Sequence, residues 1–254
     1  MDKKELFQKA DKYKSKIDSA RPLGVKSIKE LDEYFKIKLT YSSNALEGNT
    51  LSLSETKVLL EDGITIGGKT MKELLEAIGH SKAYDYMLKT ARQTGMKITE
   101  DIILKLHSLF YNGIDPDNAG EYRMQQVYIN GTEYIPPKAE NVGLAMKSFI
   151  CESNELRGKV HPIEYAALLH KRLVDIHPFI DGNGRTARLV MNLVLFNSGY
   201  GIVCIPPVLR LKYIESLNLS RMRKNEDYFI KFIAERVIET EKDYCRLLGI
   251  SMKE

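Results

Sequence analysis

The chain has 254 residues, of which 43% are hydrophobic and 28% charged, and its formal net charge is +4. These values are typical of a globular protein with a buried core. No window approaches the roughly 18 consecutive apolar residues of a membrane-spanning helix, so we expect no membrane partner. The mild charge and the lack of a long Lys/Arg run argue against direct binding of nucleic acid.

Cysteine usage indicates the cellular environment. Cys151, Cys204 and Cys245 are few and far apart, which argues against a disulfide framework. The N-terminus lacks the apolar core of a secretory signal. We therefore expect a cytoplasmic protein. No CxxC or HExxH motif occurs, so the sequence gives no sign of a structural zinc site.

Most of the chain is predicted to be helical. Residues 2–19 form a charged amphipathic segment that stops at a Pro/Gly turn. The next helix is expected to start at a Ser27 cap and to end at Gly48–Asn49, and Ser52 or Ser54 starts a short helix that reaches Leu60. Further helices are predicted over residues 69–90, 99–111, 140–156, 162–174, 185–198, 209–219 and 226–248.

One segment departs from the helical pattern. Val127, Tyr128 and Ile129 precede Asn130-Gly131, and residues 132–135 follow with further β-forming side chains. Asn-Gly between such runs is a strong hairpin signal. We expect a mainly α fold with one small β-hairpin. This hairpin is either a surface decoration or a flap whose edge strand pairs with a partner.

The stretch HPFIDGNGRTAR, residues 177–188, concentrates the chemistry. His177 can accept a proton near neutral pH, and Asp181 can hold a cation. Residues 182–184 open a helix, where backbone amides and the helix dipole favour a phosphate. Arg185 and Arg188 share one helix face and can grip neighbouring phosphates. Each feature alone has an ordinary structural explanation, but their conjunction predicts a phosphoryl or nucleotidyl transfer site.

This stretch resembles the Fic signature, HxFx(D/E)GNGRxxR, and fills every specified position. GEYRMQQVYINGTEYIPP, residues 120–137, resembles the flap of the same family, and the order of helices fits over residues 70–235. The resemblance implies a helical Fic (Fido) fold. It also implies transfer of AMP from ATP to a Ser, Thr or Tyr hydroxyl of a target protein.

Site roles follow from the resemblance, position by position. His177 would be the general base, and Asp181 would hold Mg²⁺ or Mn²⁺. The backbone of Gly182, Asn183 and Gly184 would form an anion hole around the α-phosphate.

The remaining roles concern the outer phosphates, the adenine and the target. Arg185 and Arg188 would contact the β- and γ-phosphates, and we assign Tyr213 to the adenine. The flap strand of Val127, Tyr128 and Ile129 would receive the backbone of the target protein.

A second motif lies upstream. Ser43-Asn44-Ala45-Leu46-Glu47-Gly48 resembles the inhibitory helix of the family, (S/T)xxxE(G/N). The Glu47 carboxylate would pair with Arg188 and displace the γ-phosphate, while Ser43 would hold the helix in place. We accordingly divide the chain into N-terminal helices with the inhibitory motif, residues 1–68, and a Fic core with C-terminal helices, residues 69–254.

The sequence thus predicts an auto-inhibited protein adenylyltransferase that also modifies itself, and it does not decide whether the chain also removes AMP. A nucleotide-binding regulatory module, or a phosphotransferase with weak or no AMP transfer, is the alternative. A metal hydrolase built on His161, His170 and His177 is a third. A homo-oligomer is among the expectations, and the sequence does not identify the target protein.

Overall fold

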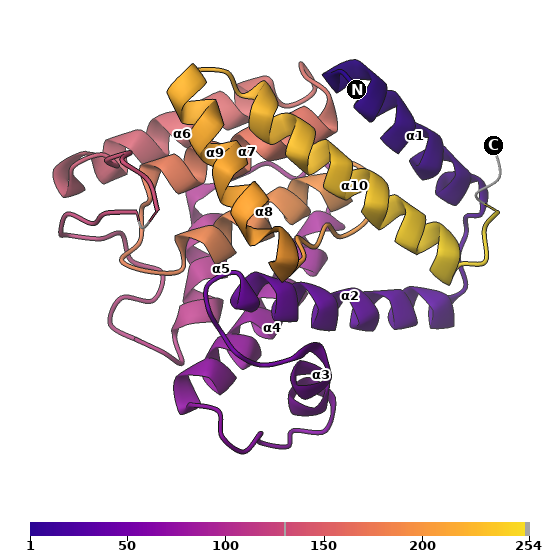
Figure 1. Ribbon diagram of the computed structural model, residues 1–254, viewed down its shortest axis with the longest axis horizontal. Helices are drawn as coiled ribbons and strands as arrows, with labels where there is room; N and C mark the ends of the chain where they lie inside the picture. The colour runs from indigo at the N-terminus through magenta and orange to yellow at the C-terminus, as the bar shows by residue number, and fades with distance from the viewer. Residues whose placement is uncertain (130, 252–254) are drawn as a thin grey trace.

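The structure is a computed structural model that describes residues 1–129 and 131–251. These residues form ten α-helices, two short 3-10 helices and no strand (Figure 1). The helices are α1 (Lys3–Ser19), α2 (Val25–Ala45), α3 (Leu53–Glu61), α4 (Met71–Ala91), α5 (Glu100–Tyr111), η1 (Ala139–Asn141), α6 (Val142–Leu156), α7 (Pro162–Ile176), α8 (Asn183–Asn197), η2 (Pro207–Leu209), α9 (Arg210–Arg223) and α10 (Asp227–Leu247).

Local signals set most of the helix ends. Ser52, Thr70 and Thr99 each cap a helix by accepting a hydrogen bond from a backbone N–H three residues on, which satisfies a donor that has no intrahelical partner. The predicted Ser27 cap is wrong, because α2 already begins at Val25 after Gly24. The same helix ends at Ala45, and Gly48 with φ 99° closes the turn that follows.

The centre of the fold is the pair α7 and α8, which pack against each other. Apolar side chains of both helices are fully buried, among them Leu169, Leu173, Leu189 and Leu193. Helices α4 and α5 cover α8, while α6 and α10 cover α7 (Figure 1). Because neighbours enclose both central helices, the loop that joins them is fixed at both ends.

The N-terminal helices join this core. Helix α1 packs along α10, and α2 packs on α4 and reaches α8. Leu6, Phe35 and Leu39 belong to the main hydrophobic cluster, whereas α3 and the start of α4 share a small separate cluster. No helix in the described part of the chain combines the length and the apolarity needed to cross a membrane.

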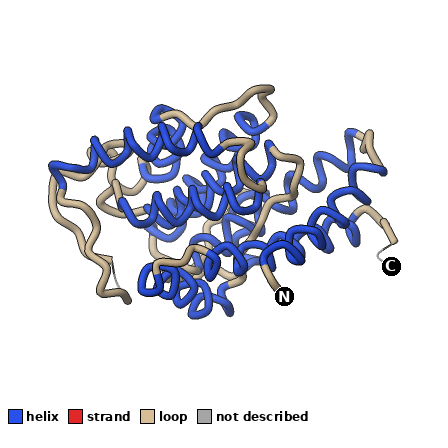
Figure 2. The backbone as a smooth tube through the Cα atoms, turned by 90° about the horizontal axis from the view of Figure 1, so that it is seen from above, coloured by secondary structure: helices blue, strands red, loops and turns tan. Residues whose placement is uncertain are grey.

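The predicted β-hairpin is not found. The segment between α5 and η1 is a long loop at one end of the helical body, without a strand in its described residues (Figure 2). Side chains satisfy several of its carbonyl groups instead: Gln126 donates to Pro136 and Asn218 donates to Gly131. Prolines also lack a donor for a ladder, and no sheet lies nearby to extend. Asn130 of the turn signal lies outside the described residues.

Candidate active site

The loop between α7 and α8 carries His177. This residue ends α7 in the left-handed region, with φ 52° and ψ 58°. Its Nδ1 lies 3.2 Å from the Val174 carbonyl oxygen, a contact that places the ring proton on Nδ1. Nε2 is therefore left with its lone pair. Burial lowers the pKa of His177 below its ordinary value, so the neutral, proton-accepting form prevails at neutral pH.

The Asn183 side chain closes the loop on itself. Its amide nitrogen donates to the Phe179 carbonyl at 2.8 Å, and its amide oxygen accepts the Phe179 N–H at 2.9 Å. Both residues are buried. Because these contacts occupy the Asn183 side chain, the groups of this stretch that can bind an anion are its backbone N–H groups.

His107 of α5 also braces the loop. Its Nδ1 accepts the N–H of Gly120 at 2.9 Å, so Nε2 carries the proton and donates to the Asp181 carbonyl at 3.1 Å. The ring stacks on Phe179 with a centroid distance of 3.7 Å. Burial lowers the pKa of His107 to about 4, which keeps the ring neutral.

The Glu47 carboxylate lies beside the start of α8. Gly182 has φ 79°, and a Cβ there would lie 2.8 Å from the Phe110 ring. The first N–H groups of α8 have no partner within the helix, and its dipole favours a negative charge there. A Cβ on Gly184 would lie 2.5 Å from Oε1 of Glu47. Glu47 therefore occupies the space directly over this helix end.

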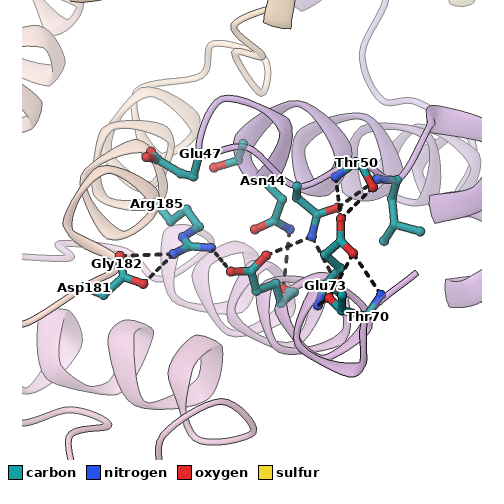
Figure 3. Close-up of polar contacts among 12 residues, drawn as sticks. Asn44, Glu47, Thr50, Thr70, Glu73, Asp181, Gly182 and Arg185 are labelled. Atoms are coloured by element: carbon teal, nitrogen blue, oxygen red, sulfur yellow. Dashed lines mark hydrogen bonds and ion pairs between the residues drawn. The ribbon is translucent and has the colours of Figure 1, made fainter. Parts of the chain in front are cut away.

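Arg185 lies between two carboxylates. Its Nη1 donates to Oε1 of Glu76 at 2.9 Å, and its Nη2 lies 3.3 Å from Oδ2 of Asp181 (Figure 3). The guanidinium also stacks 4.3 Å from the centroid of the Phe110 ring. Glu76 is buried and the Asp181 side chain is half exposed, and both border the same cavity as Arg185.

Arg188 is held by the upstream motif. Its Nε donates to the Ser43 hydroxyl at 2.9 Å, while Nη2 donates to the Ser43 carbonyl at 2.8 Å and to Oε1 of Glu47 at 2.7 Å. Although burial opposes both charges, the pair raises the pKa of Arg188 and lowers that of Glu47. Both groups are therefore ionised at neutral pH.

The segment after Glu47 is tied to the start of α4. The Asn49 amide donates to Oε2 of Glu76 at 2.9 Å, and the Thr50 hydroxyl and N–H both donate to Oε1 of Glu73 (Figure 3). Glu73 in turn caps α4 with Thr70. Residues 43–50 are thus attached at both ends, on Arg188 and on α4.

Tyr213 is buried behind Arg188. Its hydroxyl lies 3.4 Å from Nη1 of Arg188 and 3.1 Å from Nε2 of His170. Tyr213 also borders the cavity, and its assigned contact with the adenine stays a prediction.

These groups meet in one cavity of about 410 Å³, which falls within the usual range of ligand sites. The cavity is bordered by the motif loop, the inhibitory segment, the flap and α9, including His177, Asp181, Gly182, Asn183, Gly184, Arg185, Glu47, Tyr128, Ile129, Lys72 and Arg210. Val127 does not border it.

The three-histidine alternative is wrong. His161 contacts Asp11 and stacks on Phe7, and His170 is enclosed next to Tyr213, so neither joins His177. Within the described residues, no group of three His, Cys, Asp or Glu side chains is placed to hold a metal ion.

Comparisons with known proteins identify the family of this chain. The sequence profile of the Fic/DOC family matches residues 97–195. The solved structure of Fic-1 (residues 134–508) from C. elegans superposes with a TM-score of 0.87 at 30% identity, over 97% of this chain and 73% of that one. The chain belongs to the Fic/DOC family.

Other Fic proteins extend this comparison. A Fic domain-containing signalling protein from Bacteroides thetaiotaomicron has a TM-score of 0.88 at 28% identity, over 97% of this chain and 99% of that one. The protein adenylyltransferase Fic of Nematostella vectensis is 36% identical over 242 residues, 92% of this chain and 55% of that protein. The Drosophila ananassae protein of the same name is 40% identical over 196 residues, 77% of this chain and 39% of its own length.

The flap of this Fic chain is fastened by residues that sequence reasoning missed. Arg123 donates to the carbonyls of His177, Gln125 and Pro137 at 2.8, 2.9 and 2.5 Å. It therefore joins both ends of the flap to the motif loop. At the far side, the Arg221 guanidinium lies 4.9 Å from the centroid of the Tyr134 ring.

Glu76 and His107 were missed as well. Each lies on a helix among apolar neighbours and resembles an ordinary core position in the sequence. The partner of Glu76 is Arg185, which lies 109 positions away in the sequence. The partner of His107 is Asp181, which lies 74 positions away. A buried carboxylate on a helix face was the one available signal, since such a group requires a partner.

Proposed function

We propose that this chain is a protein adenylyltransferase that transfers AMP from ATP to a protein hydroxyl and that Glu47 restrains this activity. The observation that carries the proposal is one cavity that brings together a neutral histidine, a half-exposed aspartate, the N-terminus of α8 and Arg185, with Arg188 buried next to it in contact with Glu47. The Fic relatives named above support the same activity, although the chain spans only 39% and 55% of the two curated ones.

The transfer itself is a substitution at the α-phosphorus. The hydroxyl oxygen of the target forms a bond to this phosphorus, and the bond from the phosphorus to the bridging oxygen of the β-phosphate breaks, so pyrophosphate leaves. Nε2 of His177 takes the hydroxyl proton. The start of α8 stabilises the negative charge on the α-phosphate oxygens, and Arg185 and Arg188 bind the outer phosphates.

Asp181 is the residue suited to hold Mg²⁺ or Mn²⁺. Mg²⁺ prefers oxygen ligands and binds through one or two carboxylates together with phosphates and waters. The half-exposed Asp181 carboxylate at the cavity fits this description. When bound, the ion neutralises charge on the phosphates. Arg185 lies beside the same carboxylate and orients it.

Glu47 restrains the reaction through position and charge. It occupies the start of α8 and pairs with Arg188, so a γ-phosphate directed at either meets a carboxylate. The flap borders the cavity opposite this group and offers exposed Tyr128 to a protein chain. The acceptors are a target protein on this loop and the chain itself.

Removal of AMP is a second activity that this site supports. The Glu47 side chain is 37% exposed although it binds Arg188. A carboxylate with access to the cavity can orient a water whose oxygen bonds to the phosphorus of the protein-bound AMP, while the bond from this phosphorus to the protein oxygen breaks and AMP and the protonated hydroxyl are released. The measurement is loss of AMP from a modified protein incubated with the parent chain and with Glu47→Gly.

The decisive experiment compares ATP labelled at the α- or γ-phosphate. We expect Glu47→Gly to label itself from the α-position only, well above the parent, and Glu47→Gly/His177→Ala to give no label. Glu61→Gly, at the exposed end of α3, is the matched control and should behave as the parent. Label from the γ-position would indicate kinase chemistry, and binding without label would indicate a regulatory module; either overturns the proposal.

A further inference from the structure

The two carboxylate oxygens of Glu76 bind different partners. Oε1 accepts Nη1 of Arg185 at 2.9 Å, and Oε2 accepts the amide nitrogen of Asn49 at 2.9 Å. Glu76 is 7% exposed and Arg185 is 2% exposed. The Asn49 side chain, two residues after Glu47, therefore donates a hydrogen bond to this buried ion pair.

Asn49 and Arg185 share the Glu76 carboxylate. An arginine and a carboxylate can form two parallel hydrogen bonds. Here Asn49 donates to the second oxygen, and only one end of the guanidinium donates to Glu76. The other end, Nη2, is left beside Asp181 at the cavity (Figure 3).

We propose that Asn49 and Glu76 are positioning residues that hold Arg185 toward the nucleotide. The segment that carries the inhibitory Glu47 then also carries a residue that supports nucleotide binding. Without Asn49, Glu76 is free to bind both ends of the guanidinium, and Arg185 turns from the cavity toward α4. This inference rests on the proposed function, because it assumes that the cavity binds ATP.

A second contact of Asn49 allows a discriminating variant. Its amide oxygen accepts the Leu51 N–H at 3.0 Å and shapes the local turn. Asn49→Asp keeps this acceptor but loses the donors to Glu76 and to the Glu73 carbonyl, which lies 3.0 Å from the amide nitrogen, and it places a second carboxylate beside Glu76. A residue with only a turn-forming role tolerates aspartate, whereas a residue that holds Glu76 does not.

The experiment measures Mg-ATP affinity by calorimetry in the full chain carrying Glu47→Gly. We expect about tenfold weaker binding with Asn49→Ala and at least as large a loss with Asn49→Asp, because each removes a hydrogen bond to a charged group. The KM for ATP should rise by a larger factor than kcat falls, because Asn49 and Glu76 act through the arginine that binds the nucleotide. Thr50→Val is the matched control, because it removes a neighbouring contact to Glu73 and leaves Asn49 and Glu76 in place.

Three results would overturn the inference: full affinity in Asn49→Asp, an equal loss in Thr50→Val, or additive losses for Asn49→Ala and Glu76→Gln. Thermal unfolding of each variant verifies that it is folded. Failure of the proposed function is a separate result, since a Glu47→Gly chain that binds Mg-ATP and transfers no AMP contradicts that proposal while the affinity comparison remains valid.

Discussion

The Glu47 carboxylate lies 2.7 Å from Nη2 of Arg188, although the two residues are 141 positions apart in the chain. Arg188 is 1% exposed, whereas the Glu47 side chain is 37% exposed, so solvent screens part of the attraction. With that discount the pair is worth about 2 kcal/mol, or roughly a 30-fold bias. Such a bias restrains a site without locking it, and a bound partner can overcome it.

Ser43→Ala should release part of the restraint. The Ser43 hydroxyl accepts a hydrogen bond from Nε of Arg188 and is fully buried. Losing this acceptor weakens the hold on Arg188 by about 1 kcal/mol, so self-labelling should rise about fivefold, less than in Glu47→Gly. Ser42→Ala is the matched control, because its buried hydroxyl bonds the Leu39 carbonyl instead. Equal labelling in the two serine variants would contradict the role of Ser43.

Gly184→Ala should destabilise the parent more than the Glu47→Gly variant. An added Cβ would lie 2.5 Å from Oε1 of Glu47, so this carboxylate must shift and weaken its ion pair with Arg188, which costs about 1 kcal/mol. Urea unfolding of the four chains of this double-mutant cycle measures the coupling. Gly143→Ala on α6, where a Cβ meets nothing within 4 Å, should cost nothing in either background. A cost at Gly184 that is unchanged by removal of Glu47 would place the carboxylate elsewhere.

The pH profile should show a base with a lowered pKa. Burial lowers the pKa of His177 from 6.5, while the Glu47 charge acts in the opposite direction. In Glu47→Gly, kcat/KM should therefore fall as the pH is lowered, with a midpoint below pH 6.5, because protonation removes the lone pair on Nε2 of His177. Mg-ATP affinity recorded over the same range separates this loss from weaker binding. A midpoint at or above 6.5 contradicts the assignment.

His107 should make the protein sensitive to acid. Its pKa is lowered by burial from 6.5 to about 4, so the unfolded chain binds a proton in this range that the native protein does not. Its contribution to stability is present above pH 6.5 and is lost as the pH falls toward 4. Between pH 7 and 5 the parent should lose about 2 kcal/mol more unfolding free energy than His107→Gln.

The test of His107 compares the change in unfolding free energy with pH between the parent and His107→Gln. Burial raises the pKa of Glu241 to about 7, which makes stability change with pH in the opposite direction. Comparing urea unfolding of variant and parent at both pH values removes this shared contribution. Leu104→Ala, a substitution on the same helix that does not titrate, should keep the pH dependence of the parent. Equal dependence in His107→Gln would contradict a neutral His107.

Arg123→Met should impair transfer and leave nucleotide binding intact. Arg123 donates to three carbonyls that join the flap to the motif loop, including that of His177. Losing these bonds displaces the base and the flap, so kcat should fall at least tenfold, whereas Mg-ATP affinity should not change. Arg172→Met, which removes an exposed ion pair on α7, is the control. Weaker ATP binding with unchanged kcat would assign Arg123 to the nucleotide instead.

Local sequence signals account for the helices and for the composition of the motif. Caps such as Ser52 and Thr99 and the apolar spacing of α7 and α8 are local signals, because a helix forms from interactions within a few residues. The hairpin prediction failed for the same reason. Asn-Gly between β-forming residues is a local preference, and a strand pair also needs a neighbour, which the helical body does not supply.

The tertiary structure decided which groups meet. Glu76, His107 and Arg123 have ordinary sequence surroundings, and each becomes part of the site only because the fold brings a distant partner within hydrogen-bond distance. For Arg188, too, local sequence and tertiary packing each explain a different part. The motif predicts that it is a phosphate ligand, but its contacts with Ser43 and Glu47 depend on α2 packing against α8. Long-range contacts of this kind are set by burial of apolar faces, and local sequence does not encode them.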